Sequence, residues 1–407
     1  MSAWRQSTWG DEISLEYGKA IRGYQEAGGQ VRVFGSNGAI GWTDRAISEG
    51  PGVVLGRKGA YRGVQYSPDP FFVIDTAYYV KPKTDLDMRW LYYAIIHHKL
   101  GEIDDGSPIP STTRAAVYVE DVDVPAISEQ REIAAILGAL DDKIEVNRKA
   151  SATLEEMARA LYRSWFVDFD PVWAKLEGRQ PAHMDAATAA LFPDSFDNDG
   201  LPRGWHFSPM GAVSGQLKQS VKPMDAPNAA FWHYSLPAFD AGASPILENG
   251  AAIKSNKLFV PNDAILFSRL NPSTPRVWWA RSDIASATPT ASTEFYVAIA
   301  SCLEDTPWLY CLLSSPEFLE QACSRVTGTS NSHQRVPPSA LSEIEVIVPK
   351  QSVKAAFSGM TSSWFEKIHA MKAESRTLAT VRDTLLPRLM SGELRVGEAR
   401  ELVGEVA

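Results

Sequence analysis

Two segments punctuated by glycine or proline carry the side chains best suited to contact nucleic acid. Residues 55–63 contain three cations and one aromatic ring, namely Arg57, Lys58, Arg62 and Tyr61. Residues 267–276 contain two cations and one amide, namely Arg269, Arg276 and Asn271. Arginine and lysine hydrogen-bond guanine and asparagine hydrogen-bonds adenine, while glycine lets the backbone approach a phosphate. The alternative, two hairpin turns with solvated arginines, stays open.

Two further loops are rich in hydroxyl groups and end in an arginine. The first is GSPIPSTTR at 106–114, which ends at Arg114, and the second is GTSNSHQR at 328–335, which ends at Arg335. Hydroxyl and guanidinium groups suit phosphate contacts. The same composition also suits capping within a loop, so both interpretations are kept.

The sequence contains no recognisable catalytic or metal-binding constellation. Cys302, Cys311 and Cys323 with His333 do not have the spacing of a zinc site. The carboxylates nearest to a nuclease pattern are Asp69 and the pair Asp141 and Asp142 beside Lys143, but the pair lies in a helix where charges usually form the solvated face. We therefore predict no catalytic residue, no metal ligand and no cofactor in this chain.

These segments must be positioned by a chain that alternates between two kinds of structure. Residues 1–124 and 201–348 have the short β-branched runs and turns of strand-rich globules, each with one helix. Residues 128–166 and 351–390 have the apolar spacing of long helices. The order is therefore globule, long helix, globule, long helix.

Apolar side chains follow each long helix in alternating steps of three and four, as in a coiled-coil seam. Asn147 and Ser151 place one polar layer in the first seam, and a step of four follows Trp364 in the second. The predicted seam residues are Ile133, Leu137, Leu140, Ile144, Leu154, Leu161, Phe357, Trp364, Met371, Leu378 and Leu385.

The two halves also share local sequence in the same order, which indicates an internal repeat of about 220 residues. Gly106, Arg114 and Pro125 in the first half match Gly328, Arg335 and Pro349 in the second. A predicted helix precedes the glycine in each half.

Composition and charge indicate what kind of protein this chain is. The chain has 407 residues, of which 44% are hydrophobic and 22% are charged, as in ordinary globular proteins. Its net charge of −9 argues against nucleic acid only at first sight, because residues 121–200 carry nearly all of the excess. Three cysteines, a polar start and no apolar run of about 18 residues lead us to expect a cytoplasmic protein without membrane association.

The chain resembles the specificity subunits of type I restriction–modification enzymes over nearly its whole length. The similar segments are PAISEQREIAAIL at 125–137, LYRSWFVDFDP at 161–171, GLPRGW at 200–205, LLPRLMSGEL at 385–394, VFGSNG at 33–38 and GRKG at 56–59. The second half has PKQ at 349–351 where the first has the longer PAISEQ. Strict symmetry between the halves is therefore not expected.

The resemblance implies an α+β fold with two mixed α/β target-recognition domains separated by two long antiparallel coiled-coil helices, as a pseudo-two-fold internal repeat. It implies that each domain reads half of a split, asymmetric site in double-stranded DNA. The expected partners are modification (methyltransferase) subunits and a restriction (endonuclease and translocase) subunit. S-adenosylmethionine, ATP and Mg²⁺ are expected in those partners, and a noncatalytic role is expected here.

We accordingly divide the chain into target-recognition domain 1 (1–124), spacer helix 1 (125–170), an acidic linker (171–200), target-recognition domain 2 (201–348), spacer helix 2 (349–391) and a tail (392–407). The acidic middle segment suits docking of partner subunits. Two competing hypotheses are a coiled-coil adaptor that does not recognise DNA and an enzyme with a cryptic nuclease site.

Overall fold

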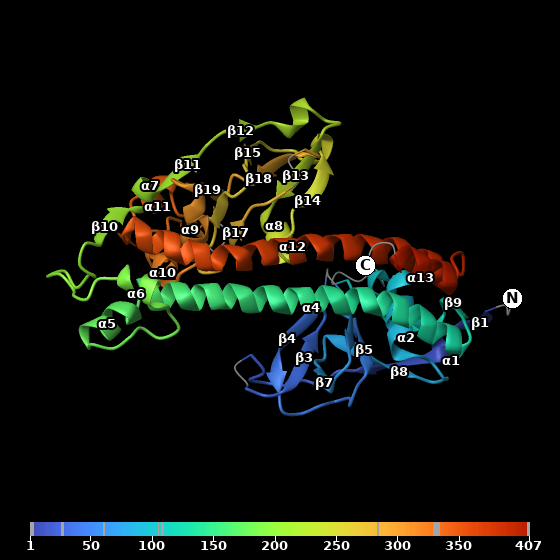
Figure 1. The fold of residues 1–407 in the computed structure, drawn as a ribbon. Coiled ribbons are helices and arrows are strands. Elements are labelled where there is room, and N and C mark those ends of the chain that lie inside the picture. The colour runs from blue at the N-terminus through green and yellow to red at the C-terminus, as the bar shows by residue number, and fades with distance from the viewer. Residues whose placement is uncertain are drawn as a thin grey trace. The chain divides into compact units, whose positions relative to one another are not determined.

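The computed structural model describes residues 4–25, 28–59, 62–104, 106, 110–282, 285–328 and 334–404. The chain forms two compact units. Unit 1 contains Met1–Glu145 and Thr377–Ala407, and unit 2 contains Val146–Arg376. Each long helix begins in one unit and ends in the other (Figure 1).

In unit 1 a strand-rich module, here called module 1, precedes the first long helix. Its sheets have the strand orders β2-β8-β5-β6, β4-β3-β7 and β1-β9. The elements are β1 (Arg5–Thr8), α1 (Trp9–Glu12), β2 (Ile13–Tyr17), β3 (Val31–Gly35), β4 (Gly38–Thr43), β5 (Gly52–Gly56), β6 (Val64–Ser67), β7 (Phe71–Val73), β8 (Ala77–Pro82), α2 (Met88–His97), a 3₁₀ turn (Leu100–Glu102), α3 (Arg114–Tyr118) and β9 (Asp121–Val124).

In unit 2 the corresponding module 2 lies between the two long helices in sequence. Its sheets have the strand orders β11-β19-β16-β17, β12-β15-β18-β13-β14 and β10-β20. The elements are β10 (His206–Pro209), α7 (Met210–Val213), β11 (Ser214–Leu217), β12 (Ser220–Val221), β13 (Ala230–Tyr234), α8 (Leu236–Asp240), β14 (Ile246–Asn249), β15 (Lys257–Phe259), β16 (Ile265–Ser268), β17 (Val277–Trp279), β18 (Thr288–Ala291), β19 (Phe295–Ala300), α9 (Thr306–Leu313), α10 (Pro316–Ser324), α11 (Pro338–Ser342) and β20 (Glu345–Val348). Three 3₁₀ turns lie at Pro223–Asp225, Gly250–Ala252 and Leu303–Asp305.

The two modules repeat one arrangement of elements. Each begins with a strand that pairs with the last strand of the same module, β1 with β9 and β10 with β20. Each also contains a four-stranded sheet. In module 1 β8 lies between β2 and β5, and in module 2 β19 lies between β11 and β16. The candidate cation loop follows β5 in module 1 and β16 in module 2. The repeat expected from the sequence is therefore present in the three-dimensional structure of each half.

The structure corrects the alignment of the two hydroxyl-rich loops. A β-bridge joins Lys58 to Ser111 in module 1, and the equivalent bridge joins Leu270 to Arg335 in module 2. Arg335 therefore corresponds to Ser111 and not to Arg114, with the same spacing that separates Pro125 from Pro349. Sequence matching paired the two arginines because residue type was the only guide within loops of different composition.

The long helices are α4 (Ile127–Phe166) and α12 (Gln351–Met390), and the short α13 (Val396–Gly404) follows the second. They run antiparallel within each unit. In unit 2, Asn147 contacts Glu374 and, further along α4, Phe166 contacts Phe357 with ring centroids 5.3 Å apart. In unit 1, Asp141 and Arg382 join the same two helices at 2.6 Å. Between α4 and module 2, the acidic segment forms α5 (Asp170–Leu176) and α6 (Ala186–Ala190).

The predicted seam residues are buried to different degrees. Ile133, Leu137, Leu140, Leu378, Leu385 and Phe357 are buried, whereas Ile144, Leu154, Leu161, Trp364 and Met371 are partly buried. Phe365, rather than Trp364, packs into the core of unit 2 against Trp279, with ring centroids 4.8 Å apart. The pattern shifts by one residue there because α12 covers module 2 as well as α4.

Of the two residues in the polar layer of the seam, Asn147 is hydrogen-bonded, whereas the buried Oγ of Ser151 has no hydrogen-bond partner among the described residues. Asn147 is buried, and its Nδ2 donates to Glu374 Oε2 at 2.7 Å. Because Asn147 is buried and Glu374 is exposed, this hydrogen bond disfavours helix registers in which the Asn147 amide would lack a partner.

Glu12 in module 1 anchors the first strand and gives a prediction about stability. It is buried and accepts hydrogen bonds from Arg5, Ser7 and Thr84 at 2.5–2.6 Å. Burial alone would raise its pKa, but these hydrogen bonds lower the pKa to about 2. The carboxylate therefore stabilises the fold above pH 4.5, and this contribution is lost as the pH falls towards 2.

The variant Glu12→Gln should lower the free energy of unfolding by about 3 kcal/mol at pH 7, because it removes one partner of a buried charge network. The difference from wild type should shrink as the pH falls below 4.5. Urea denaturation across pH measures both effects, with the exposed Glu49→Gln as control. A deficit that did not change with pH would show that Glu12 acts through packing alone.

Candidate nucleic-acid interface

The cation loop of module 1 follows β5 and is fixed by its backbone. Arg57 N donates to Thr76 O at 3.0 Å, and Arg57 O accepts from Thr112 N at 2.9 Å. Gly59, at a positive φ of 108°, donates its N–H to Pro110 O at 3.0 Å. These bonds hold the loop against Thr76, which directly precedes β8, and against Pro110 and Thr112 in the hydroxyl-rich loop. Side chains that are far apart in the sequence are thereby brought together.

Those side chains form a stack of cations on an exposed tyrosine, here called the Tyr17 cluster (Tyr17, Tyr78, Arg57 and Arg114). Tyr17 is 48% exposed at the end of β2. The guanidinium carbons of Arg57 and Arg114 lie 4.9 and 4.2 Å from its ring centroid. Tyr78 supports the ring at a centroid distance of 5.1 Å.

The two arginines of the cluster make few polar contacts with the rest of the protein. Arg57 Nη1 donates to Asp75 O at 3.0 Å, and Arg114 lies 3.9 Å from Glu16 in a partly exposed ion pair. Burial raises the pKa of Tyr78 to about 12, so that its hydroxyl stays protonated and donates to Thr112 O at 3.2 Å. A planar guanidinium held on an aromatic face keeps its edge available for a base or a phosphate.

Lys58 and Arg62 flank this cluster differently. Lys58 is exposed. Arg62 points inward, where its guanidinium donates to Gly59 O at 2.7 Å, Gly101 O at 2.9 Å and Thr112 Oγ1 at 3.1 Å. It therefore positions the loop rather than presenting a charge to a ligand. Tyr61 lies outside the described residues.

Replacing Arg62 with methionine should lower the free energy of unfolding by about 2 kcal/mol, because carbonyl groups inside the loop lose a charged donor. Affinity for DNA should fall modestly through the looser loop. Urea denaturation tests the first effect, with exposed Arg45→Met as control. Unchanged stability together with a large loss of DNA affinity would instead identify Arg62 as a direct contact.

Module 2 places Arg269 at the position of Arg57, but most of its candidate cations pair with groups of the module itself. Arg269 N donates to Glu294 O at 2.9 Å, as Arg57 does to Thr76, and Arg269 Nη2 donates to Thr293 O at 2.6 Å. Arg335 forms a two-pronged ion pair with Glu294 at 2.9 Å. Arg276 pairs with Asp240 through two hydrogen bonds, at 2.6 and 2.9 Å.

Asn271 occupies the position of Gly59. It has a positive φ of 48°, and its N–H donates to Gln334 O at 3.0 Å. Its Oδ1 is buried and accepts no hydrogen bond from the described residues. Because the two modules hold different side chains on one backbone arrangement, they cannot present the same pattern of donors and acceptors.

Sequence reasoning missed Tyr17, Tyr78 and Glu16. Tyr17 lies 40 residues before Arg57 and 97 before Arg114 in the sequence, so no local motif links them. The one available signal was an aromatic residue followed by glycine, Tyr17 and Gly18, which is common in strand-rich domains.

Two of the carboxylates considered for a nuclease, Asp141 and Asp142, have structural roles. Asp141 accepts from Tyr93 and Arg382, both at 2.6 Å, and Asp142 forms an ion pair with Arg89 at 2.7 Å. Within the described ranges no group of three or more histidine, cysteine, aspartate or glutamate side chains is arranged to hold a metal ion. In the same part of the chain, no helix is long and apolar enough to span a bilayer.

Comparison with known proteins finds similarity to the specificity subunits of type I restriction enzymes. Residues 16–156 match the family described as the type I restriction modification DNA specificity domain. The chain is 26% identical over 412 residues to the type I restriction enzyme MjaIX specificity subunit of Methanocaldococcus jannaschii, covering 96% of this chain and 88% of that protein. The chain is therefore similar to type I specificity subunits over most of its length.

A second specificity subunit, that of the type I restriction enzyme HindI from Haemophilus influenzae, is 26% identical over 400 residues, covering 83% of this chain and 84% of that one. A crystal structure of the type I restriction–modification S subunit from M. genitalium has the same fold, with a TM-score of 0.54 and 17% identity over 95% of this chain and 96% of that one. The matched residues, 16–156, include all four residues of the Tyr17 cluster.

Proposed function

We propose that this chain gives sequence specificity to a type I restriction–modification complex by binding a bipartite, asymmetric site in double-stranded DNA. The observation that carries the proposal is the recurrence of one backbone arrangement in both modules, with Arg57 and Arg269 at equivalent places after β5 and β16. A module that occurs twice in one chain can contact two stretches of duplex, as the halves of a dimeric binder do.

The site is expected to be asymmetric because the two modules differ chemically. Module 1 presents arginines on a tyrosine, whereas module 2 has Arg276 and Arg335 paired with its own carboxylates. Arg57 forms no ion pair with the described residues, and the ion pair of Arg114 with Glu16 is long at 3.9 Å, so both can bind phosphate or guanine more readily than arginines held in short ion pairs. Module 1 should therefore contribute more of the salt-dependent binding energy.

We further propose that the complex includes modification and restriction subunits. The helices α4 and α12 are proposed to act as a spacer between the modules. A helix of 40 residues is about 60 Å long, which is enough to separate two half-sites by a full turn of DNA. The chain itself is proposed to be noncatalytic. S-adenosylmethionine, ATP and Mg²⁺ would be used by the partner subunits, and the acidic residues 171–200 are a candidate docking surface.

Mapping of N6-methyladenine across the source genome, with and without this gene, tests the proposal. We expect one split, nonpalindromic motif to lose its methylation when the gene is deleted and to regain it on complementation. An adaptor that does not recognise DNA would leave the set of methylated motifs unchanged. The repeated cation loops already favour recognition over the adaptor, because a coiled-coil adaptor has no need for them.

A further inference from the structure

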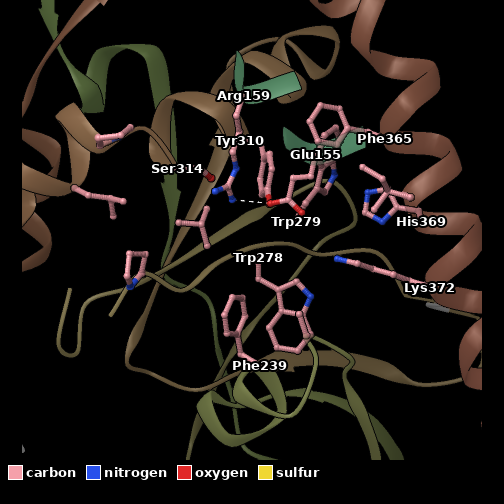
Figure 2. A pocket seen from close by; sticks show the side chains of 16 residues that line it. Glu155, Arg159, Phe239, Trp278, Trp279, Tyr310, Ser314, Phe365, His369 and Lys372 are labelled. Atoms are coloured by element: carbon pink, nitrogen blue, oxygen red, sulfur yellow. Dashed lines mark hydrogen bonds and ion pairs between the residues drawn. The ribbon is translucent and has the colours of Figure 1, made fainter. Parts of the chain in front are cut away.

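Unit 2 contains a cavity whose polar groups the proposed function does not use. It has a volume of about 330 Å³ and lies where α4 and α12 meet the edge strand β17 and the helices α8 and α9 (Figure 2). Its walls are largely aromatic, formed by Phe239, Trp278, Trp279, Tyr310 and Phe365. The rings contact one another, as at Trp279 with Phe365 and at Phe239 with Trp278, where centroids lie 4.8 and 5.6 Å apart.

Some polar groups in the cavity satisfy one another. Glu155 on α4 accepts a hydrogen bond from Tyr310 at 2.5 Å and forms an ion pair with Arg159 at 2.6 Å. Figure 2 shows these three side chains grouped on one side of the cavity. The single carboxylate in the lining is therefore occupied.

The remaining polar groups have no such partners. Lys372 extends from α12 into the space between Trp278 and Trp279 (Figure 2), and it forms neither an ion pair nor a hydrogen bond with any residue that the structure describes. The buried Nε2 of His369, one turn earlier on α12, is likewise unpartnered among those residues. Burial lowers the pKa of Lys372, against the opposing effect of the Glu155 charge, and burial lowers the pKa of His369 to about 3.

An unpaired ammonium group among aromatic side chains costs stability, and a methionine would fill the same volume without that cost. Residues that reduce stability in this way are typical of binding sites. The charge balance of the lining is also unequal, because the two cations Arg159 and Lys372 face one carboxylate, Glu155. A bound anion would supply the negative charge that this lining lacks.

We propose that this cavity binds a small planar aromatic anion, with its ring against the indole of Trp278 and its charged group on Lys372 and His369. Indole faces stack well on planar rings, and the volume is at the lower end for ligand sites, which suits one ring system with one anionic group. A nucleoside monophosphate and an aromatic carboxylate share this chemistry. An occupant would tie β17 of module 2 to α12.

Isothermal titration of the full chain with adenosine 5′-monophosphate, indole-3-acetate and uncharged adenosine tests this proposal. We expect at least one of the two anions to bind and adenosine to bind at least about tenfold more weakly, since a charged contact is lost. Binding of the phosphate alone or of the carboxylate alone would identify the source of the anion.

Variants on α12 separate a ligand site from a structural feature. Lys372→Met should weaken binding of the anion at least about tenfold while raising the melting temperature of the empty protein, and Lys372→Arg should restore affinity. Lys367→Met, which removes an exposed lysine of the same helix, should change neither. The proposal is overturned if neither anion binds, or if Lys372→Met binds as tightly as the wild type.

Discussion

Replacing Arg57 and Arg114 with alanine should lower the affinity of the assembled complex for its DNA site by about 100-fold. Each arginine that reads a base contributes about 1–3 kcal/mol, and both lie on the exposed ring of Tyr17. If the two contacts are to phosphates, the salt dependence of binding should decrease by about two counterions. If they are to bases, specificity should relax only in the half of the site that module 1 reads.

Fluorescence anisotropy with labelled duplexes over a range of salt concentrations distinguishes these cases. The matched control is the double variant Lys19→Ala and Arg22→Ala, which removes two exposed cations of module 1 outside the Tyr17 cluster. Tyr17→Ala should reproduce part of the loss, because both guanidinium groups then lose their common support. Equal effects of the cluster and control variants would show that only net charge matters.

Removing one heptad from each long helix should shorten the unspecified gap of the DNA site by about three base pairs and leave the half-site sequences unchanged. Seven helical residues correspond to about 10.5 Å, and base pairs are spaced about 3.4 Å apart. Residues 144–150 of α4 and 374–380 of α12 are suitable, since the two segments lie near each other at the Asn147 layer. A whole heptad preserves the face that each helix presents to its partner.

The shortened complex should bind the original site at least about 100-fold more weakly, because one module can no longer reach its bases. Binding to a series of duplexes that differ only in gap length measures the shift. The control is a deletion confined to the tail after α13, which should leave the preferred gap unchanged. Altered half-site bases, or an unchanged preference for the original gap, would contradict a spacer role for the helices.

The order of elements could be predicted from the sequence because each depends on short-range patterns. The apolar spacing of residues 128–166 and 351–390 identified both long helices, and matching segments in both halves revealed the repeat. Helical periodicity pointed to Trp364 and not to its neighbour Phe365, because it cannot show that α12 also packs on Trp279 of module 2.

The candidate interface was less predictable, because its residues meet only in the folded chain. Arg57 and Arg114 were recognised by type, but Tyr17, which brings them together, has no local signal. Arg62 looked equivalent to Arg57 in sequence, yet it is used to hold carbonyl groups of its own loop. Which arginine faces solvent depends on backbone hydrogen bonds that composition does not encode.

Selection of bound duplexes from a random library by the assembled complex tests the central claim most directly. We predict two short blocks of specified bases with different sequences, separated by a fixed number of unspecified base pairs, and loss of one block alone when Arg57 and Arg114 are replaced. A single contiguous block, a palindromic site, or simultaneous loss of both blocks would contradict recognition by two separate modules.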